Sequence, residues 1–253
     1  MATILRMPPD KDRMKVVAIV QARMGSTRLP GKVLMDLEGV AVLDRVLKRL
    51  GRSELIHESL VATTTAAADD VIVEHCEHAR WRVFRGSEED VLDRYYQAAT
   101  RVRADVVVRI TSDCPLVDPE VTDATIRVFL DQQADYASNV QVRTYPRGLD
   151  TEVMTMQALT RAWREGTNLY QREHVTPYIC ENPGKFRLHG IENGADYSRH
   201  RWTLDTPEDL QLLRAIYARF GGRDDFCWRE VLKVVESEPA LADINRHIVQ
   251  KTV

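Results

Sequence analysis

Three cations and two glycines stand close together in residues 21–32, a combination suited to binding phosphate groups. Glycine lets the backbone approach an anion closely, while Arg23, Arg28 and Lys32 supply positive charge and hydrogen-bond donors. An apolar, β-branched run at residues 16–20 precedes them and is typical of a strand covered on both faces of a parallel sheet. Ligands of such sheets bind beyond the carboxyl ends of the strands. We therefore predict a nucleotide-phosphate loop formed by Gln21, Ala22, Arg23, Gly25, Ser26 and Lys32.

This loop is not a Walker A sequence. Counting back from Gly31 and Lys32, Ser26 stands where the first glycine of that motif should be, and Val33 replaces the Ser or Thr that would hold magnesium. Pro30 disfavours helix at the preceding residue, so we expect the loop to stay extended across its ligand. The alternative interpretation is a solvated basic turn.

Two aspartates form a second candidate site. Asp113 follows the apolar run 106–110, Asp205 follows a short extended segment at 201–204, and each precedes the predicted start of a helix. A parallel sheet would place both side chains at its carboxyl edge, beside the cationic loop. Because Mg²⁺ prefers one or two carboxylates together with phosphate oxygens and water, we predict that Asp113 and Asp205 bind Mg²⁺. Each aspartate alone is equally well explained by a turn or a helix cap.

The motif Ala22-Arg23-x-x-Ser26-Thr27-Arg28-Leu29-Pro30-Gly31-Lys32 resembles the signature of the sugar cytidylyltransferases, which include the CMP-Kdo synthetases and the acylneuraminate cytidylyltransferases. The stretch from Gln21 to Ser26 most resembles the subgroup that serves spore-coat polysaccharide biosynthesis. The resemblance runs from about residue 15 to about residue 220, and residues 111–116 and 204–210 are similar to two magnesium-associated segments of the family. It implies an enzyme that transfers CMP from CTP to an acidic sugar, or to a related acid such as a phosphonate, and releases pyrophosphate.

Nucleotidyl transfer needs positioning and charge neutralisation from the protein, because a substrate oxygen attacks the α-phosphorus in line and pyrophosphate leaves. We predict that Lys32 and Arg23 hold the triphosphate and that Arg28 favours the departing pyrophosphate. Asp113 and Asp205 would hold one or two Mg²⁺ ions that polarise the α-phosphate. No residue of the sequence stands out as a dedicated general base.

Residues similar to the nucleobase and ribose loops of the family are Thr63, Thr64, Arg85, Gly86 and Ser87. Thr64 and Thr65 replace an aspartate that commonly follows Ala-Thr in the family, so the sequence leaves the choice between CTP and GTP open. The turn at residues 85–87 is equally well explained as a cap of the following helix.

The residues predicted to contact the acceptor lie in the second half of the chain and are Arg147, Asp150, Glu152, His174 and Tyr178. Arg147 has the fork geometry that binds a carboxylate, and Asp150 or Glu152 would accept hydrogen bonds from sugar hydroxyls. Residues 145–152 resemble the acceptor loop of the family, and residues 173–178 resemble a sugar-contacting helix. Thr-Pro at residues 176–177 departs from the pattern of the Kdo enzymes and leaves the acceptor unidentified, and a structural role explains His174 equally well.

Length and composition describe an ordinary globular chain of 253 residues, 44% hydrophobic and 29% charged, with a formal net charge of −3. That charge gives no overall bias towards nucleic acid or a membrane surface. No apolar run approaches the length of a membrane helix, and residues 1–14 lack the core of a signal peptide, so we predict a disordered lead-in there. The cysteines have neither zinc-type nor C-x-x-C spacing and are expected to be reduced thiols of a soluble cytoplasmic protein: Cys76, Cys114, Cys180 and Cys227.

Strand-like and helix-like segments alternate through the first half of the chain, which predicts βαβ units and a parallel sheet. The expected strands are residues 16–20, 58–62, 81–84 and 106–110, and the expected helices are 43–50, 69–79, 87–102 and 118–130. The second half is less regular, with strands expected at 135–140, 150–155 and 185–191 and helices at 156–165 and after Thr206. We predict an α/β fold with one nucleotidyltransferase domain over residues 15–253, a Rossmann-like, mostly parallel sheet flanked by helices, as in the nucleotide-diphospho-sugar transferases. A smaller irregular insertion at about 140–195 would serve acceptor binding and homodimerisation.

Two other functions remain compatible with these patterns. A glycosyltransferase that consumes a nucleotide sugar would use a similar sheet but normally carries an Asp-x-Asp metal motif, which residues 112–114 do not provide. A non-catalytic nucleotide-binding module would leave the two aspartates and three cations unexplained. Pyrophosphate release from a free nucleoside triphosphate separates the predicted enzyme from both.

Overall fold

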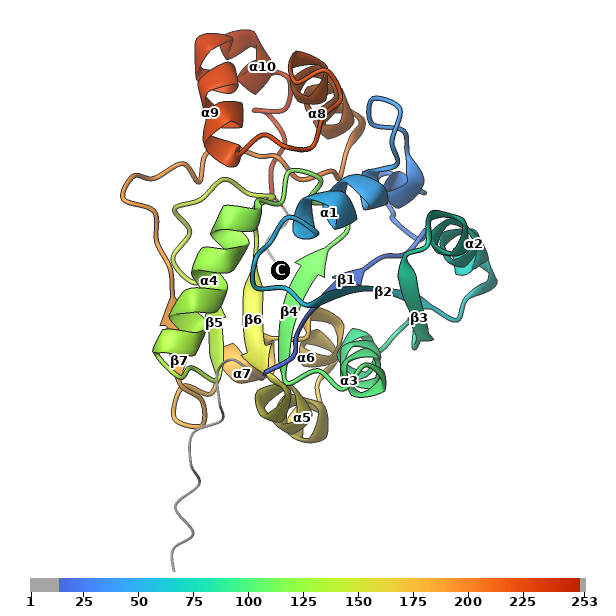
Figure 1. Cartoon of the computed structure of the whole chain (residues 1–253), viewed down its shortest axis with the longest axis vertical. Coiled ribbons are helices and arrows are strands. Elements are labelled where there is room, and N and C mark those ends of the chain that lie inside the picture. Colours follow the sequence, from blue (N-terminus) through green and yellow to red (C-terminus); the bar gives the residue numbers. More distant parts are fainter. Residues whose placement is uncertain (1–13, 251–253) are drawn as a thin grey trace, which may run out of the picture.

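A seven-stranded sheet with the strand order β3-β2-β1-β4-β6-β5-β7 runs through the centre of the molecule (Figure 1). The structure is a computed structural model that describes residues 14–250, so all but the last residue of the predicted lead-in lie outside it. The strands are β1 (Val16–Gln21), β2 (Glu58–Thr64), β3 (Arg82–Gly86), β4 (Val106–Thr111), β5 (Tyr136–Ser138), β6 (Glu152–Thr155) and β7 (Leu188–Gly190). β1 to β4 are parallel, whereas β6 runs antiparallel to both β4 and β5. The prediction of a mostly parallel sheet is confirmed.

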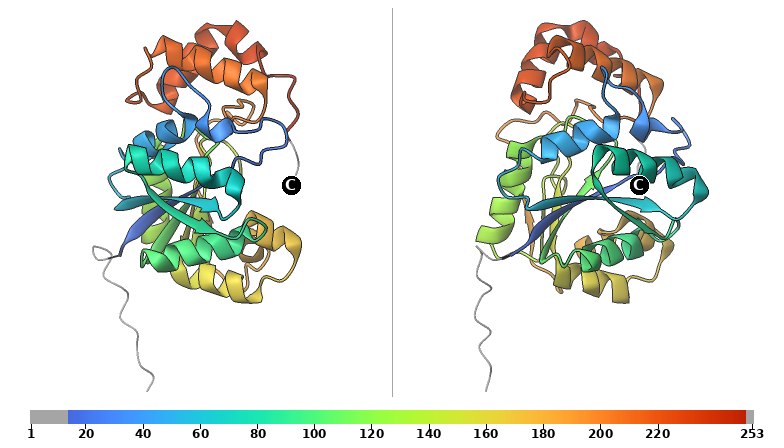
Figure 2. Two further views of the ribbon diagram at one scale, coloured as in Figure 1. Left: turned by 90° about the vertical axis from the view of Figure 1, so that its right-hand side faces the viewer. Right: turned by 45° about the vertical axis from the view of Figure 1, so that its right-hand side comes forward.

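Helices cover both faces of this sheet. On one face lie α1 (Val42–Leu50), α2 (Asp70–Ala79) and α4 (Pro119–Asp131). On the other lie α3 (Val91–Arg101), α5 (Met156–Glu165) and α7 (Pro177–Cys180), with α6 (Leu169–His174) against α3. The C-terminal helices α8 (Pro207–Arg219), α9 (Trp228–Ser237) and α10 (Pro239–Asp243) form a group at one end of the molecule (Figures 1 and 2). Their apolar cluster also includes Leu37, Val42 and Val121, so it joins these helices to the rest of the domain.

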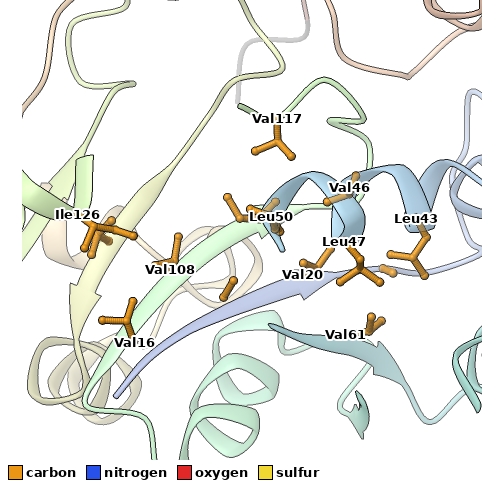
Figure 3. Packing of buried hydrophobic residues seen from close by; sticks show 14 of the residues in the cluster. Val16, Val20, Leu43, Val46, Leu47, Leu50, Val61, Val108, Val117 and Ile126 are labelled. Carbon is orange, nitrogen blue, oxygen red and sulfur yellow. The ribbon is translucent and has the colours of Figure 1, made fainter. Parts of the chain in front are cut away.

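Both faces of β1 are buried, as the continuous apolar run predicts. Val16 and Val20 face α1 and α4, while Val17 and Ile19 face the opposite helices. Figure 3 shows the first cluster, in which these valines lie below the apolar face of α1 formed by Leu43, Val46, Leu47 and Leu50. Each fully buried side chain of this size contributes roughly 1.5–3 kcal/mol through the hydrophobic effect. The start of the nucleotide loop is therefore fixed to a rigid strand.

Local capping signals place two helix starts correctly. The Asp118 side chain accepts from Glu120 N and Val121 N at the start of α4. Thr206 and Asp209 form a reciprocal capping box at the start of α8, with proline in the first turn. The predicted helix at 87–102 begins later, at Val91, because Asp90 rather than Ser87 caps it.

The segment before Asp205 differs from the prediction. Among the described residues, 201–204 form no strand and join the structure through an isolated bridge between Arg147 and Arg201. Leu204 N donates directly to Asp113 O at 2.8 Å. Asp205 therefore reaches Asp113 through a backbone hydrogen bond between loops and not through a place in the sheet.

Two further features bear on the sequence expectations. Within residues 14–250, no helix has the length and apolar character needed to cross a membrane. The four cysteines, expected as reduced thiols, are unpaired.

Candidate active site

The loop after β1 folds back on itself before the short 3-10 helix η2 (Lys32–Leu34). Gly31 N donates to Met24 O at 3.0 Å, and Asp69 Oδ1 accepts from Met24 N at 2.7 Å. Gly31 has φ of 72°, a left-handed conformation that turns the chain into η2 and favours glycine. The loop is thus a closed turn and not the extended segment that Pro30 predicts.

A pocket with a volume of about 260 Å³ opens beside this loop. Its lining includes all the residues predicted to take part in catalysis, namely Arg23, Arg28, Lys32, Asp113 and Asp205. The remaining loop residues assigned to the nucleotide line it as well, namely Gln21, Ala22, Gly25 and Ser26. Helices α3 and α6 contribute Arg94, Glu173 and His174. The fold therefore brings the first loop, the end of β4 and the segment before α8 together at one cavity.

Lys32 lies at the centre of the charged part of this pocket. Its Nζ donates to Asp113 Oδ2 at 2.8 Å, to Asp205 Oδ1 at 2.8 Å and to Leu204 O at 2.7 Å. Arg28 Nη2 lies 3.0 Å from the same Asp205 oxygen. The second oxygen of Asp205 accepts from Arg201 Nη2 at 2.7 Å. The two carboxylates thus converge on one cationic centre.

Opposite charges keep this cluster ionised. Burial would lower the pKa of the Lys32 ammonium, but Asp113 and Asp205 outweigh that effect and hold the pKa above its ordinary value. Burial would raise the pKa of Asp205, but Lys32 and Arg201 hold it below its ordinary value. Arg201 is in turn bound to buried Asp209, at 2.9 Å. Asp205 is therefore available as an anionic ligand at neutral pH.

Comparison with known families decides what kind of site this is. Residues 17–237 match the family model described as cytidylyltransferase. The chain belongs to the cytidylyltransferase family. The spore coat polysaccharide biosynthesis protein SpsF of Bacillus subtilis is 36% identical over 90% of this chain and 96% of its own length. An uncharacterized protein of Methanocaldococcus jannaschii is 39% identical, over 94% of this chain and 98% of its own.

Solved structures agree with this family assignment. A cytidylyltransferase from Leptospira borgpetersenii superposes with a TM-score of 0.87 and 34% identity, covering 94% of this chain and 100% of that one. A CMP:2-keto-3-deoxy-manno-octonic acid synthetase complexed with CTP gives a TM-score of 0.64 over 81% of this chain and 99% of that one, at 18% identity, which concerns the fold alone. The predicted resemblance is confirmed, and the protein is a CTP-using nucleotidyltransferase. This excludes the glycosyltransferase and the non-catalytic module.

The residues assigned to the base and ribose lie at the carboxyl ends of β2 and β3, outside the lining of the pocket. Arg85 donates to Thr64 O at 2.9 Å and to Ala66 O at 3.0 Å, and Thr64 Oγ1 donates to Asp69 Oδ2. Thr63 is buried, and a Cβ at Gly86 would lie 2.9 Å from Arg94 Cγ. Ser87 Oγ accepts from Asp90 N. In this cytidylyltransferase Arg85, Thr64 and Ser87 make hydrogen bonds within residues 64–90. The part of all five residues in base recognition stays a prediction.

The residues assigned to the acceptor are spread over several places. Of the five, only His174 lines the pocket. Arg147 lines a different cavity, together with His200 and Arg201. Asp150 forms a two-pronged ion pair with Arg143, at 2.6 Å and 2.7 Å.

The other two acceptor candidates are engaged within the protein. Glu152 is buried on β6 and paired with Arg109. Tyr178, in the first turn of α7, donates to Glu165 and accepts from Lys185. Neither side chain lines the pocket, and the direct contact of Glu152 and Tyr178 with an acceptor stays a prediction.

The sequence analysis did not identify two arginines of the pocket, Arg94 on α3 and Arg109 on β4. Arg109 stands inside the otherwise apolar run of β4, between Val108 and Ile110. A charge in a strand that is buried on both faces requires a partner or a ligand, and that signal was present in the sequence. Arg94 gives no comparable signal, because a helical arginine is usually solvated.

Proposed function

We propose that this cytidylyltransferase transfers CMP from CTP to an acidic sugar, or to a related acid such as a phosphonate, and releases pyrophosphate. The observation that carries the proposal is the convergence of Lys32, Asp113 and Asp205 beside a loop that also presents Arg23 and Arg28 to the pocket. The likeness to a spore coat polysaccharide biosynthesis protein supports a role in building surface polysaccharide or glycoconjugate.

The two aspartates fit a magnesium ion that arrives with the nucleotide. Both carboxylates contact one cation, the Lys32 ammonium, at 2.8 Å, so they already face a common point. No group of three or more His, Cys, Asp or Glu side chains suited to a metal exists within residues 14–250. Phosphate oxygens of the nucleotide and water would supply the remaining ligands. Mg²⁺ is usually bound in this way, by one or two carboxylates and substrate phosphates. When bound there, the ion would polarise the α-phosphate and neutralise charge on the triphosphate.

Lys32 can bind two kinds of partner in turn, first the two aspartates and then the phosphate oxygens of the nucleotide. In the free protein Lys32, Arg28 and Arg201 face three carboxylates, those of Asp113, Asp205 and Asp209. This balanced cluster gains little from a metal ion alone. When a triphosphate enters, Lys32 and Arg28 can turn to its oxygens and release the two aspartates. Arg201 stays with Asp209 and keeps Asp205 in position.

The residues of the chain then promote the transfer by positioning the triphosphate and stabilising its charge. The closed loop fixes the triphosphate by its cationic side chains, and Arg28 stabilises the charge that develops on the pyrophosphate as it leaves. The acceptor hydroxyl attacks the α-phosphorus from the side of the pocket formed by α6. No side chain of the lining is placed as an obvious base, and the titratable groups that α6 contributes are Glu173 and His174.

We further propose that the enzyme is a cytoplasmic homodimer associated through the insertion at about 140–195. The insertion contains three of the exposed large hydrophobic side chains of the described chain, which are Val142, Leu169 and Tyr170. Leu169 and Tyr170 are adjacent at the start of α6, and exposed apolar side chains that lie together are typical of an interface.

Pyrophosphate release tests the proposed function. CTP, GTP, ATP and UTP are each combined with Mg²⁺ and with a panel of sugar acids and phosphonates, with neutral sugars as controls. We expect release with CTP and an acid only. Release with neutral sugars, or equal rates with all four nucleotides, would contradict the proposal.

A further inference from the structure

Three polar side chains of the pocket carry a buried atom with no hydrogen-bond partner in the described part of the chain. The atoms are Gln21 Oε1, Arg94 Nε and Arg109 Nε. All three residues line the pocket. Buried donors and acceptors are nearly always paired in folded proteins, so such a group of unpaired atoms around one cavity points to a polar ligand.

Arg109 is held in place from behind. Its Nη1 donates to Glu152 Oε2 across the β4–β6 pair, where the two residues are direct partners. The other oxygen of Glu152 accepts from Tyr136 Oη at 2.7 Å and from Thr176 Oγ1 at 2.7 Å. Both oxygens of Glu152 are therefore engaged within the protein, and the residue fixes the arginine. The remaining donors of the guanidinium are left for a ligand.

Sheet order places Arg109 on the opposite side of β1 from the residues assigned to the base and ribose. The loops that carry Thr63, Thr64 and residues 85–87 follow β2 and β3, on one side of β1. β4 and β6 lie on the other side of β1, and the same part of the pocket is bordered by Glu173 and His174 of α6. A nucleotide whose phosphates lie at the β1 loop with its base towards β2 leaves the β4 side free. The second substrate must occupy that side.

We propose that Arg109 binds the acid group of the acceptor, with Glu152 as its positioning residue. This inference rests on the proposed function and deepens it, since it says how the enzyme selects an acid. An arginine presents donors in a planar fork that matches a carboxylate or a phosphonate. Gln21 Oε1 and the carboxylate of Glu173 are acceptors in the lining of the same pocket and suit the hydroxyl groups of a sugar.

The proposal competes directly with the assignment of the acid group to Arg147. That side chain lies in a separate cavity with His200 and Arg201, and Arg201 stands between it and Asp205. An acceptor bound there would place its acid group behind the carboxylate cluster, away from the lining of the nucleotide pocket. The two arginines are therefore distinguished by one pair of variants.

The test measures pyrophosphate release with CTP, Mg²⁺ and two acids, 3-deoxy-manno-octulosonate and N-acetylneuraminate, each beside its methyl ester. The variants are Arg109→Lys, the double variant Arg109→Gln/Glu152→Gln, and Arg147→Gln. The double variant removes both charges of the pair, so a folded protein is retained without a buried unpaired carboxylate. Arg127→Gln, which alters an exposed ion pair with Glu54, is the matched control.

We expect the KM for the acid to rise about 10- to 100-fold in both Arg109 variants, because a hydrogen-bonded charge pair is worth about one to two powers of ten in affinity. The KM for CTP and its binding by calorimetry should stay unchanged. The preference for acid over ester should disappear in the double variant, which a merely structural role for Arg109 would not cause.

Three outcomes overturn the inference while leaving the proposed function intact: an unchanged acid KM with unchanged acid preference, a rise in KM for CTP instead, or the loss of acid preference in Arg147→Gln. If the wild type binds CTP but releases pyrophosphate with no acid of the panel, the proposed function fails and the inference fails with it.

Discussion

Lys32 and Asp113 are 81 positions apart in the sequence, yet Lys32 Nζ lies 2.8 Å from Asp113 Oδ2. The same ammonium also bonds to Asp205 Oδ1 and to the backbone at Leu204. One side chain therefore connects the loop after β1, the end of β4 and the segment that leads into α8. It also separates two carboxylates that would otherwise repel each other.

Replacing Lys32 by alanine should abolish most turnover without unfolding the protein. Removing one donor aimed at a charge-developing transition state typically costs on the order of 10²–10³ in rate, and Arg28→Ala should behave similarly. Steady-state pyrophosphate release together with the thermal midpoint checks this. Lys233→Ala, at an exposed position of α9, is the control and should match the wild type. Near-normal rates in both loop variants would show that the loop is only a surface turn.

Asparagine at position 113 or 205 separates metal binding from structure. Both variants keep the shape of the side chain and lose one negative charge, so pyrophosphate release should fall steeply in each. Their stabilities should differ, because Asp205 pairs with Arg201, whose side chain is only 6% exposed, in addition to Lys32, whereas the ion pair of Asp113 within residues 14–250 is with Lys32. We expect Asp205→Asn to lose about 1–3 kcal/mol of unfolding free energy and Asp113→Asn much less. Full activity in either variant would remove that residue from the metal site.

Magnesium should bind the free enzyme poorly and the CTP complex well. Lys32 satisfies both aspartates in the free protein, so a metal ion alone must displace it. Titration calorimetry with MgCl₂, in the presence and absence of CTP, measures this directly. In Lys32→Ala the free protein should bind the ion more tightly than the wild type does. Equal affinity with and without nucleotide would contradict this role of Lys32.

The parts of the fold that were predictable depend on local sequence. The continuous apolar runs of β1 and β4 and the capping residues Asp118 and Thr206 act on residues a few positions away, whereas the closed form of the glycine-containing loop depends on Asp69, 45 positions from Met24. The carboxyl ends of the parallel strands β1 and β4 lie at the same edge of the sheet, which brings Asp113 to the loop. The family resemblance added the chemistry that these local patterns leave open.

The acceptor side was not predictable, because it depends on which distant strands become neighbours. Glu152 is a plausible sugar contact in a polar loop, until β6 pairs antiparallel with β4 and buries it against Arg109. Arg147 has the side chain expected of an acid-binding residue in the sequence. In the structure its backbone forms a bridge with Arg201, and its side chain lines a different cavity. Sequence spacing contains no information on either pairing.

The buried pair of Glu152 and Arg109 should make stability depend on pH. Burial would raise the pKa of Glu152, but Arg109 and the bonds from Tyr136 and Thr176 hold it below its ordinary value. A carboxylate whose folded pKa is lowered stabilises the protein fully above its unfolded pKa of about 4.3 and loses that contribution as the pH falls through the folded pKa.

Glu152→Gln leaves Arg109 buried without a counter-ion and should cost roughly 3–5 kcal/mol at pH 7. The difference from the wild type should shrink as the pH falls below the unfolded pKa of about 4.3 towards the lowered folded pKa of Glu152. Urea unfolding at several pH values measures both, with Glu54→Gln on the exposed surface as the control. A difference that stays constant down to pH 3 would show that the pair does not stabilise the fold.

Association should depend on the start of α6. Leu169 is 87% exposed there, with Tyr170 beside it, and the same helix ends in His174 at the pocket. If this face forms the homodimer interface, Leu169→Glu buries a charge at the contact and should convert the dimer to a monomer. The acceptor KM should then rise as well, because α6 loses its support. Val249→Glu, at a position 85% exposed outside the insertion, is the matched control and should remain dimeric. Light scattering at micromolar concentration decides the question, and a monomeric wild type, or a Leu169→Glu variant that stays dimeric, would refute this interface.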